Sequence, residues 1–446
     1  MTAATTIAPP TATAARLLAG DDGTGRALGL DEHLALHGPL PHRGTARRGS
    51  VGPLVSTVDA AGLRGRGGGW FPTARKLRAV ADASGQARRR PVVVGNGMEG
   101  EPASGKDAVL LSRSPHLVLD GLELAAEAVG SREVYLAVHR GSPVLPAVEH
   151  ALAERRSRAR DRVEITLVTP PERYVASEES ALSQYVGRGV ALPTSGPRPF
   201  ERGVSGRPTL VQNVETLAHL ALLARHGADW FRSLGTAEAP GTALVTVGGA
   251  VGAPGVVEVA VGTPITEVLQ RCGGPTGSPQ ALLTGGYGGA WVGPAAADAP
   301  WSPEGLAAVG GVIGAGVLLV LPDTACGLAE TARVATWMAG ESAGQCGPCR
   351  FGLPSVAEDL AGLAARGRSD VRDLQRLRGR LGLVTGRGAC RHPDGTARLV
   401  GSALRVFEAD VVRHTRGTCS AGHRHGWLPV PAGRPVPVPA AGREFR

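Results

Sequence analysis

The glycine-rich stretch at residues 65–69 is the first of three groups whose residue types could do chemistry. It precedes a helical pattern that contains Lys76, and Phe71 lies between the two. Successive unhindered backbone N–H groups at a helix start can bind a phosphate, and a lysine one turn into the helix adds a positive charge. The stretch therefore predicts a phosphate-binding loop, for which an ordinary flexible loop is the alternative.

Cysteines form the second group. Two residues separate Cys346 from Cys349, and Cys390 follows 41 residues later. Such spacing aims several sulfurs at one point and is typical of an iron-sulfur cluster. Three thiolates together with His392 would also satisfy tetrahedral zinc, which is the alternative.

Three further cysteines stand outside this motif. We expect Cys272 and Cys326 to be buried apolar thiols, because free cysteine behaves as a small hydrophobic residue. Cys419 lies near the C-terminal end of the chain and stays unassigned.

Carboxylates in two short motifs form the third group. One motif covers residues 96–102 and the other covers residues 174–182. Acids in such motifs can orient a dinucleotide or a flavin, whereas a solvated acidic surface is the alternative. The carboxylates concerned are Glu99, Glu101, Glu178 and Glu179.

Short apolar runs alternate with helical patterns in the region that holds the glycine stretch and the acidic motifs. This alternation predicts a doubly wound α/β domain that binds its ligand at the carboxyl ends of the strands. The strand patterns lie at residues 91–94, 133–138 and 163–168, and the helical patterns at residues 115–129, 144–158 and 177–186.

Two further domains are expected after it. Strand patterns around one short helix predict a small β-grasp-like module, and helical spacing predicts a helical domain around the motif cysteines. An Ala- and Pro-rich start and a Pro-, Arg- and Gly-rich end predict an extended N-terminal arm and a disordered tail. The predicted arm, α/β domain, β-grasp-like domain, helical domain and tail are residues 1–55, 56–235, 240–325, 326–419 and 420–446.

The amino-acid composition indicates which polar residues matter and which partners are not expected. Of the 48 basic residues only Lys76 and Lys106 are lysines, and the asparagines are limited to Asn96 and Asn213. Lys76 and Asn96 lie in the groups described above, Lys106 shortly follows residues 96–102, and Asn213 lies in a further motif at residues 206–216. This placement suggests that their residue types are needed there. The net charge of +9 comes from arginines spread along the 446 residues, and aromatic residues make up 4%. We therefore expect a solvated basic surface and no nucleic-acid partner.

No apolar stretch is long enough to span a membrane, and the N-terminus lacks the pattern of a secretory signal. We therefore expect a cytoplasmic protein without a transmembrane segment. Peripheral attachment to the inner face of the membrane is compatible with this expectation.

Four ordered motifs resemble one family, the NADH-binding flavoprotein (F-type, 51 kDa-like) subunit of respiratory complex I, or NADH-quinone oxidoreductase. They are residues 65–76, 96–102, 174–182 and 206–216, and the second is also similar to the C subunit of Rnf complexes. Residues 341–352 resemble the cluster-binding box of the same family. The likeness extends over roughly residues 50–415.

The resemblance implies a Rossmann-like FMN-binding domain, a β-grasp-like soluble-ligand-binding (SLBB) domain and a C-terminal helical bundle with an iron-sulfur cluster. It implies NADH as the substrate. Carried over by position, the residues that bind FMN or NADH are Gly65, Arg66, Gly67, Gly68, Phe71, Lys76, Asn96, Glu99, Glu101, Tyr174, Glu178, Glu179, Val211, Gln212 and Asn213. The cluster ligands are Cys346, Cys349 and Cys390.

This chain departs from the family pattern at several positions. Trp70 stands where the family has glycine, and could be a stacking partner for nicotinamide or a plug, while Met98 replaces an aspartate of the flavin pocket. Ala343 replaces the first cysteine of the box, so the cluster is expected to be 4Fe-4S with a non-cysteine ligand, or 3Fe-4S. Solvent or a small thiol could fill the position, and the candidate residues are Glu341, Ser342, His392 and Cys419.

The predicted function is electron input. NADH would reduce FMN, and electrons would pass singly through the cluster to a partner, because a flavin converts between two-electron and one-electron carriers. The expected partner is an iron-sulfur protein, a ferredoxin-like protein, or a membrane redox protein or quinone system. The alternative is a non-catalytic FMN- or quinone-binding subunit that holds a redox assembly together, with NADH access and the cluster lost.

Overall fold

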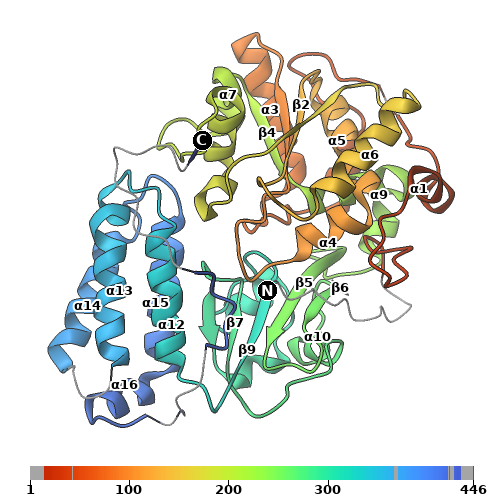
Figure 1. Cartoon of the computed structure of the whole chain (residues 1–446). Helices are drawn as coiled ribbons and strands as arrows, with labels where there is room; N and C mark the ends of the chain where they lie inside the picture. Colours follow the sequence, from red (N-terminus) through yellow and green to blue (C-terminus); the bar gives the residue numbers. More distant parts are fainter. Residues whose placement is uncertain (1–14, 43, 366–369, 420, 422–425, 433–444) are drawn as a thin grey trace.

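The computed structural model describes residues 15–42, 44–365, 370–419, 421, 426–432 and 445–446. Figure 1 shows an α/β part, a smaller part built on a mixed sheet, and a helical bundle beside both. Most of the predicted disordered tail and the first 14 residues of the predicted arm lie outside the described residues. No described helix is both long enough and apolar enough to cross a membrane.

The α/β part is built on a parallel sheet with the strand order β3-β2-β1-β4. The inner strand β1 begins with three fully buried valines, as expected for a strand that is covered on both faces. The expected α/β class is confirmed. The strands are β1 (Val92–Asn96), β2 (Val134–Ala137), β3 (Ile165–Val168) and β4 (Thr209–Asn213).

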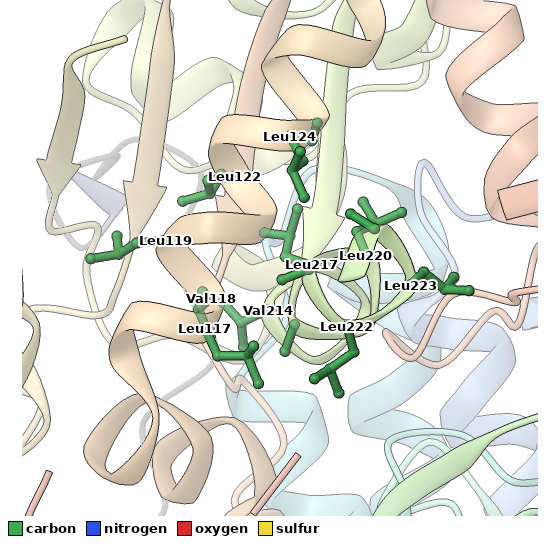
Figure 2. Close-up of a cluster of buried hydrophobic side chains, with 14 of the residues drawn as sticks. Leu117, Val118, Leu119, Leu122, Leu124, Val214, Leu217, Leu220, Leu222 and Leu223 are labelled. Carbon is green, nitrogen blue, oxygen red and sulfur yellow. The ribbon is translucent and has the colours of Figure 1, made fainter. Parts of the chain in front are cut away.

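Nine α-helices belong to the described part of the chain before the second sheet. Two of them, α5 and α9, face each other with leucine side chains (Figure 2). Gly121 permits this crossing, since a Cβ there would collide with the carbonyl oxygen of Leu217. The helices are α1 (Leu30–His37), α2 (Leu54–Ala61), α3 (Thr73–Ala87), α4 (Lys106–Arg113), α5 (Pro115–Val129), α6 (Leu145–Ser157), α7 (Glu179–Arg188), α8 (Pro199–Arg202) and α9 (Val214–Arg232).

The described part of the predicted N-terminal arm packs on the body, which differs from an extended arm. Leu17 is fully buried, and the backbone N–H groups of residues 16–18 donate to the Glu258 carboxylate at 2.8–3.1 Å. The α1 helix places the buried His33 2.9 Å from Asp120. Polar anchors on distant residues therefore hold this stretch, and no local periodicity reveals them.

The second sheet is mixed, with the order β6-β5-β9-β7-β8. Its parallel pair is β5 with β9, and the other neighbours are antiparallel. The elements are β5 (Thr242–Gly249), β6 (Gly255–Ala260), α10 (Ile265–Gln270), β7 (Pro279–Thr284), β8 (Ala290–Val292), α11 (Pro303–Ala308) and β9 (Val317–Pro322).

The third part is a helical bundle with its own apolar core. A π-helical turn, Pro348–Gly352, leads from the cysteine motif into its second helix. The bundle helices are α12 (Gly327–Gly340), α13 (Leu353–Ala364), α14 (Val371–Val384), α15 (His392–Val406) and α16 (Glu408–Thr415).

Candidate functional site

The carboxyl edge of the first sheet gathers polar residues from several motifs. Asn96 ends β1 and Asn213 ends β4, and the two are register partners. The Asn96 side chain donates to the Ser177 carbonyl at 2.8 Å, just before α7. Asn213 caps α9, where its Oδ1 accepts the N–H of Glu215 at 3.0 Å. The two asparagines therefore hold the loops at the edge where such sheets bind ligands.

The glycine-rich loop between α2 and α3 borders a cavity of about 890 Å³. Gly67, Gly68 and Gly69 line it, and Gly68 has a φ of +97°, which favours glycine. A Cβ built on Gly69 would meet nothing within 4 Å. The N–H groups of these three glycines donate no hydrogen bond to any residue that the structure describes. They form a cradle that suits the oxygens of a phosphate.

The opposite wall of the cavity comes from the helical bundle, which the sequence analysis missed. Thr385 directly follows α14, Arg391 precedes α15, and Arg398 is exposed on α15. Arg391 pairs with Asp394 at 2.9 Å. Positions 391, 394 and 398 follow the i, i+3, i+7 spacing of one helix face, and this spacing was the available signal.

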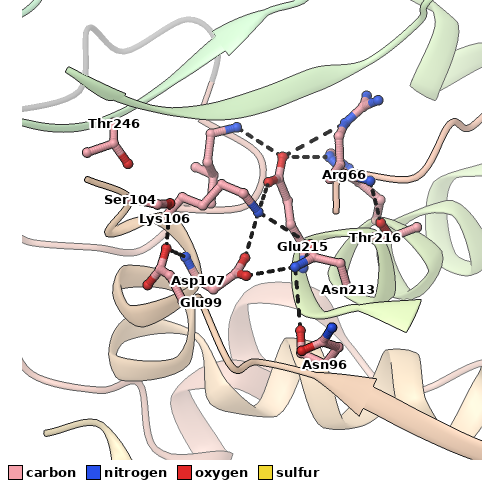
Figure 3. Close-up of polar contacts among 12 residues, drawn as sticks. Arg66, Asn96, Glu99, Ser104, Lys106, Asp107, Asn213, Glu215, Thr216 and Thr246 are labelled. Carbon is pink, nitrogen blue, oxygen red and sulfur yellow. Dashed lines mark hydrogen bonds and ion pairs between the residues drawn. The ribbon is translucent and has the colours of Figure 1, made fainter. Parts of the chain in front are cut away.

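Lys106 belongs to a buried polar network (Figure 3). Its Nζ lies 2.6 Å from Asp107 Oδ1 and 2.9 Å from Glu215 Oε2, and Asn213 donates to Asp107 Oδ2 at 2.7 Å. Burial alone would lower the pKa of Lys106, but the two carboxylates raise it above its usual value. The ammonium is therefore charged and already paired within the protein.

Arg66 joins the same network to the second sheet (Figure 3). Its guanidinium donates to the carbonyls of Thr242 at 3.0 Å and Pro240 at 3.2 Å, and lies 3.8 Å from Glu215. Glu215 also accepts the N–H of Leu244 at 3.0 Å. Burial lowers the pKa of Arg66 to about 10, which keeps it charged at neutral pH. Arg66 therefore ties the α/β part to β5.

Lys76 lies on α3 with its Nζ 3.1 Å from Glu179 Oε2 at the start of α7. Arg198 lies 3.7 Å from the other oxygen of this carboxylate. Phe71 is 50% exposed, and the Arg75 guanidinium lies 5.4 Å from the centre of its ring. The sequence-predicted residues Phe71, Lys76 and Glu179 thus stay accessible to a ligand, and Lys76 meets a carboxylate rather than a free phosphate position.

Two of the predicted acids cap helices. Glu99 has a φ of +40°, and its carboxylate accepts two N–H groups of the first turn of α4 at 2.8 and 2.9 Å. Glu178 caps α7 by accepting the N–H groups of its first turn at 2.8 and 3.1 Å. Burial raises the pKa of both carboxyls. A helix N-terminus favours a negative charge. Both carboxylates are therefore engaged by the protein itself, whereas the sequence analysis considered ligand binding or a solvated acidic surface.

Glu101 connects the α/β part to the second sheet. Its Oε2 accepts the N–H of Tyr287 at 2.8 Å, in the turn between β7 and β8. The contact is close, since a Cβ on Gly286 would lie 2.5 Å from the Glu101 carboxylate. Burial raises the pKa of Glu101 to about 8.

The other carried-over residues lie deeper in the fold. Tyr174 packs at the bundle, with its ring 5.7 Å from Trp337 and 5.2 Å from His392. Val211 and Gln212 are each 4% exposed on β4, and the Gln212 amide lies beside Gly65. Of these residues, Gln212 borders the glycine loop, Val211 lies in a core cluster of the α/β part, and Tyr174 packs against the bundle.

Trp70 and Met98, two departures from the family pattern, lie in hydrophobic cores. Trp70 is 9% exposed and packs with side chains of the second sheet, and Arg66 lies 4.2 Å from its ring centre. Met98 packs in a core cluster of the α/β part. The second sheet therefore gives this large ring an apolar place. The roles of Trp70 as a stacking partner for nicotinamide or as a plug stay predictions.

The cysteine motif follows the C-terminal end of α12. Cys346 and Cys349 flank the start of the π-helical turn, and Cys390 lies just before α15. Burial, and then the Cys346 and Cys390 thiols, raise the pKa of Cys349. Ala343 lies between the end of α12 and Cys346.

Two candidates for the missing ligand hold buried polar atoms without a hydrogen-bond partner, Ser342 Oγ and His392 Nδ1. His392 Nε2 lies 2.8 Å from the Met338 carbonyl, which can only accept, so Nε2 carries the proton and Nδ1 a lone pair. Glu341 is engaged instead, with its carboxylate 3.3 Å from Arg173. Ser342 Oγ and His392 Nδ1 therefore remain the candidates for the position of the missing cysteine.

Cys419, the remaining candidate, lies elsewhere. It groups with Cys326 and His414 at the N-terminal end of α12, whereas Ala343 follows its C-terminal end. The 14 residues of α12 separate the two places by about 21 Å. The suggestion of Cys419 as a cluster ligand is therefore wrong. Cys326 is half-buried beside polar partners, so the expectation of a buried apolar thiol fails there, while Cys272 is fully buried.

Three protein-family models match successive parts of the chain. The Nuo51 FMN-binding domain matches residues 58–222, the SLBB domain matches residues 244–289, and the NADH-ubiquinone oxidoreductase-F iron-sulfur binding region matches residues 329–414. The α/β part, the second sheet and the bundle follow the same order.

Whole-chain similarity agrees with the models. The F subunit of the NADH-quinone oxidoreductase of Mycobacterium tuberculosis (strain H37Rv) is 31% identical, over 82% of this chain and 85% of the relative. Its counterpart from Streptomyces coelicolor is 30% identical, over 82% and 83%. The crystal structure of an NAD+-reducing NiFe hydrogenase in the air-oxidized state matches with a TM-score of 0.73 at 31% identity, over 80% of this chain and 62% of that one. This chain belongs to the family of F subunits of NADH-quinone oxidoreductases.

Proposed function

We propose that this chain is an electron-input flavoprotein subunit that oxidises NADH through FMN and passes electrons through an iron-sulfur cluster. The cavity between the glycine loop and α15 carries this proposal, because it joins a phosphate cradle to the domain that holds the cysteines. FMN, when bound, accepts a hydride and releases single electrons.

The glycine loop supports the flavin assignment. The unpaired N–H groups of Gly67, Gly68 and Gly69 would hold the FMN phosphate, and Arg398 would add positive charge from the facing helix. The wall behind the glycine loop would be shaped by Asn96, Tyr174, Val211, Gln212 and Asn213. In this proposal Arg66, Glu99, Glu101 and Glu178 position the loops, because their polar atoms are already engaged.

The exposed group around Phe71 supports a dinucleotide site. The ring presents an apolar face, and the Lys76–Glu179 pair can rearrange to hydrogen-bond a ribose or carboxamide because the two side chains are 26% and 30% exposed. We propose that NADH enters here and that these side chains orient it toward the flavin.

The cluster is proposed to be 4Fe-4S, held by Cys346, Cys349, Cys390 and His392 Nδ1. His392 is preferred to Ser342 because the Met338 carbonyl already fixes the tautomer that a ligand needs. A 3Fe-4S cluster on the three thiolates is the second form to be tested.

The partner is proposed to be an iron-sulfur or ferredoxin-like subunit of an assembly such as the one its relatives are named for. We further propose that the chain works on the cytoplasmic side, peripheral to the membrane. The domain boundaries predicted from the sequence serve as the proposed boundaries of the three working domains.

The test measures flavin and iron in anaerobically purified protein and then adds NADH. FMN, iron and sulfide should be present, and NADH should bleach the flavin absorbance. Flavin that stays oxidised under excess NADH would refute NADH oxidation and leave the non-catalytic scaffold function. Zinc in place of iron, lost on replacing Cys349, would refute the cluster.

A matched pair of variants tests the cavity. Gly69→Leu should reduce FMN content or NADH-dependent bleaching without changing thermal stability, because its Cβ projects into open space and its backbone needs no left-handed φ. Gly277→Leu is the control, since it meets nothing within 4 Å and lies in an exposed loop of the second sheet. Equal flavin content and bleaching in both variants would contradict the placement of the cofactor.

A further inference from the structure

A second group of metal-ligating side chains lies at the N-terminal end of α12. The ligand atoms of Cys326, His414 and Cys419 all lie within 4.8 Å of one another. Cys326 directly precedes α12, His414 lies in the last turn of α16, and Cys419 follows that helix. Three separate positions of the bundle therefore converge on one point.

The orientation of His414 suits a ligand. Its Nδ1 lies 3.2 Å from the carbonyl oxygen of Leu363 at the end of α13, and the ring is 1% exposed. A carbonyl can only accept, so Nδ1 carries the proton and Nε2 presents a lone pair. That Nε2 faces Cys326 Sγ at 3.5 Å. Metal-binding histidines are commonly held by this kind of contact from the other ring nitrogen.

The distance between His414 Nε2 and Cys326 Sγ also fits a bound metal ion. Zinc bonds of about 2.3 Å to sulfur and about 2.0 Å to nitrogen, at a tetrahedral angle, separate the two ligand atoms by about 3.5 Å. The observed separation of 3.5 Å matches this value. Two thiolates and one imidazole form a soft donor set that selects zinc over magnesium or calcium.

The neighbouring carboxylate is engaged elsewhere. Asp410 accepts from Arg413 through Oδ1 and from Gln280 at 3.1 Å through Oδ2. Within the described residues the group therefore offers three protein ligands.

We propose that Cys326, His414 and Cys419 bind one zinc ion whose fourth position is taken by water. The ion joins the start of α12 to the end of α16 and the segment after it, and so closes the bundle at the end remote from the iron-sulfur motif. About 21 Å of α12 separate the two sites, so zinc and iron should respond independently to substitution.

The test uses the full-length protein, purified with zinc in the medium, and measures zinc, iron and FMN per chain together. Wild type should hold one zinc ion. Cys419→Ser and His414→Ala should lose the zinc while iron and FMN stay at wild-type levels. Cys326→Ser should do the same and still cap α12, because serine replaces the cysteine sulfur that accepts the Ala329 N–H. Cys272→Ala, at a buried thiol outside the group, is the control and should keep its zinc.

A second measurement needs no variant. Zinc should protect Cys326 and Cys419 from alkylation, and a chelator should expose both. Wild-type protein without zinc, a disulfide between Cys326 and Cys419, or zinc lost only on replacing Cys346 or Cys390 would each overturn the proposal. A simple thiol–imidazole hydrogen bond would show as absence of zinc with no change on adding chelator.

Discussion

Replacing Lys106 with methionine should destabilise the α/β part strongly. The ammonium is 3% exposed and lies within 2.9 Å of two carboxylates, Asp107 and Glu215. Methionine keeps most of the packing but leaves one unbalanced negative charge, because Lys106 and Arg66 now neutralise these two acids. Breaking a buried pair in this way costs about 3–5 kcal/mol.

This loss of stability corresponds to a decrease in the melting temperature, Tm. In a domain of this size each kcal/mol moves Tm by about 2–4 °C, so Lys106→Met should lower Tm by roughly 6–20 °C. Lys76→Met is the matched control: its pair with Glu179 is partly exposed, which limits the loss to about 0–1 kcal/mol. Thermal melting of FMN-free protein, followed by circular dichroism, measures both.

The double variant Lys106→Met/Glu215→Gln separates charge from packing. It removes one charge of each sign and should recover part of the lost Tm, as expected for residues in one network. A Lys106→Met protein that melts like wild type but no longer retains FMN would refute the argument, because Lys106 would then serve the phosphate and not the fold.

Three further outcomes are expected. Gly121→Ala should cost about 1–3 kcal/mol in urea unfolding, because its methyl would collide with the Leu217 carbonyl oxygen, whereas Gly362→Ala on α13 meets nothing and should be neutral or stabilising. Burial raises the pKa of Glu101 from about 4.5 to about 8, so the folded state binds the extra proton; stability should fall as pH rises through this window, and Glu101→Gln should flatten the slope. Ala343→Cys should supply a fourth thiolate and lower the reduction potential of the cluster, measured by redox titration of its paramagnetic signal; an unchanged potential would argue against a ligand at this position.

Local signals explain which elements could be predicted. The helix expected at residues 115–129 is α5, with proline in its first turn and Gly130 in a left-handed conformation at its end. By contrast β4 and the start of α9 lie within the motif at residues 206–216, where Gln212 and Asn213 interrupt the apolar run. Strand periodicity is therefore weak there.

The residues of the candidate site also differ in how well the sequence predicts them. The glycine loop could be predicted because its glycines are clustered, and the two asparagines stood out because asparagine is scarce in this chain. The facing wall with Arg398 was missed because it comes from a different domain, where the helical spacing of residues 391, 394 and 398 was a weak signal. The scarcity of lysine indicated that Lys106 is needed as a lysine. The structure shows that its ammonium pairs with two buried carboxylates rather than pointing to a ligand. Spacing alone cannot distinguish those roles, whereas burial does.

The loss of one cysteine at Ala343 has a direct electrostatic meaning. In the proposed cluster a neutral His392 imidazole in place of a thiolate would make the cluster one unit less negative, and histidine ligation raises the potential of iron-sulfur centres. This ligation would therefore favour electron flow from flavin to cluster and disfavour the reverse. The His392 ring lies 5.2 Å from Tyr174. In the proposal, Tyr174 belongs to the wall behind the cavity, so the change in cluster charge would fall on the bundle side of that wall.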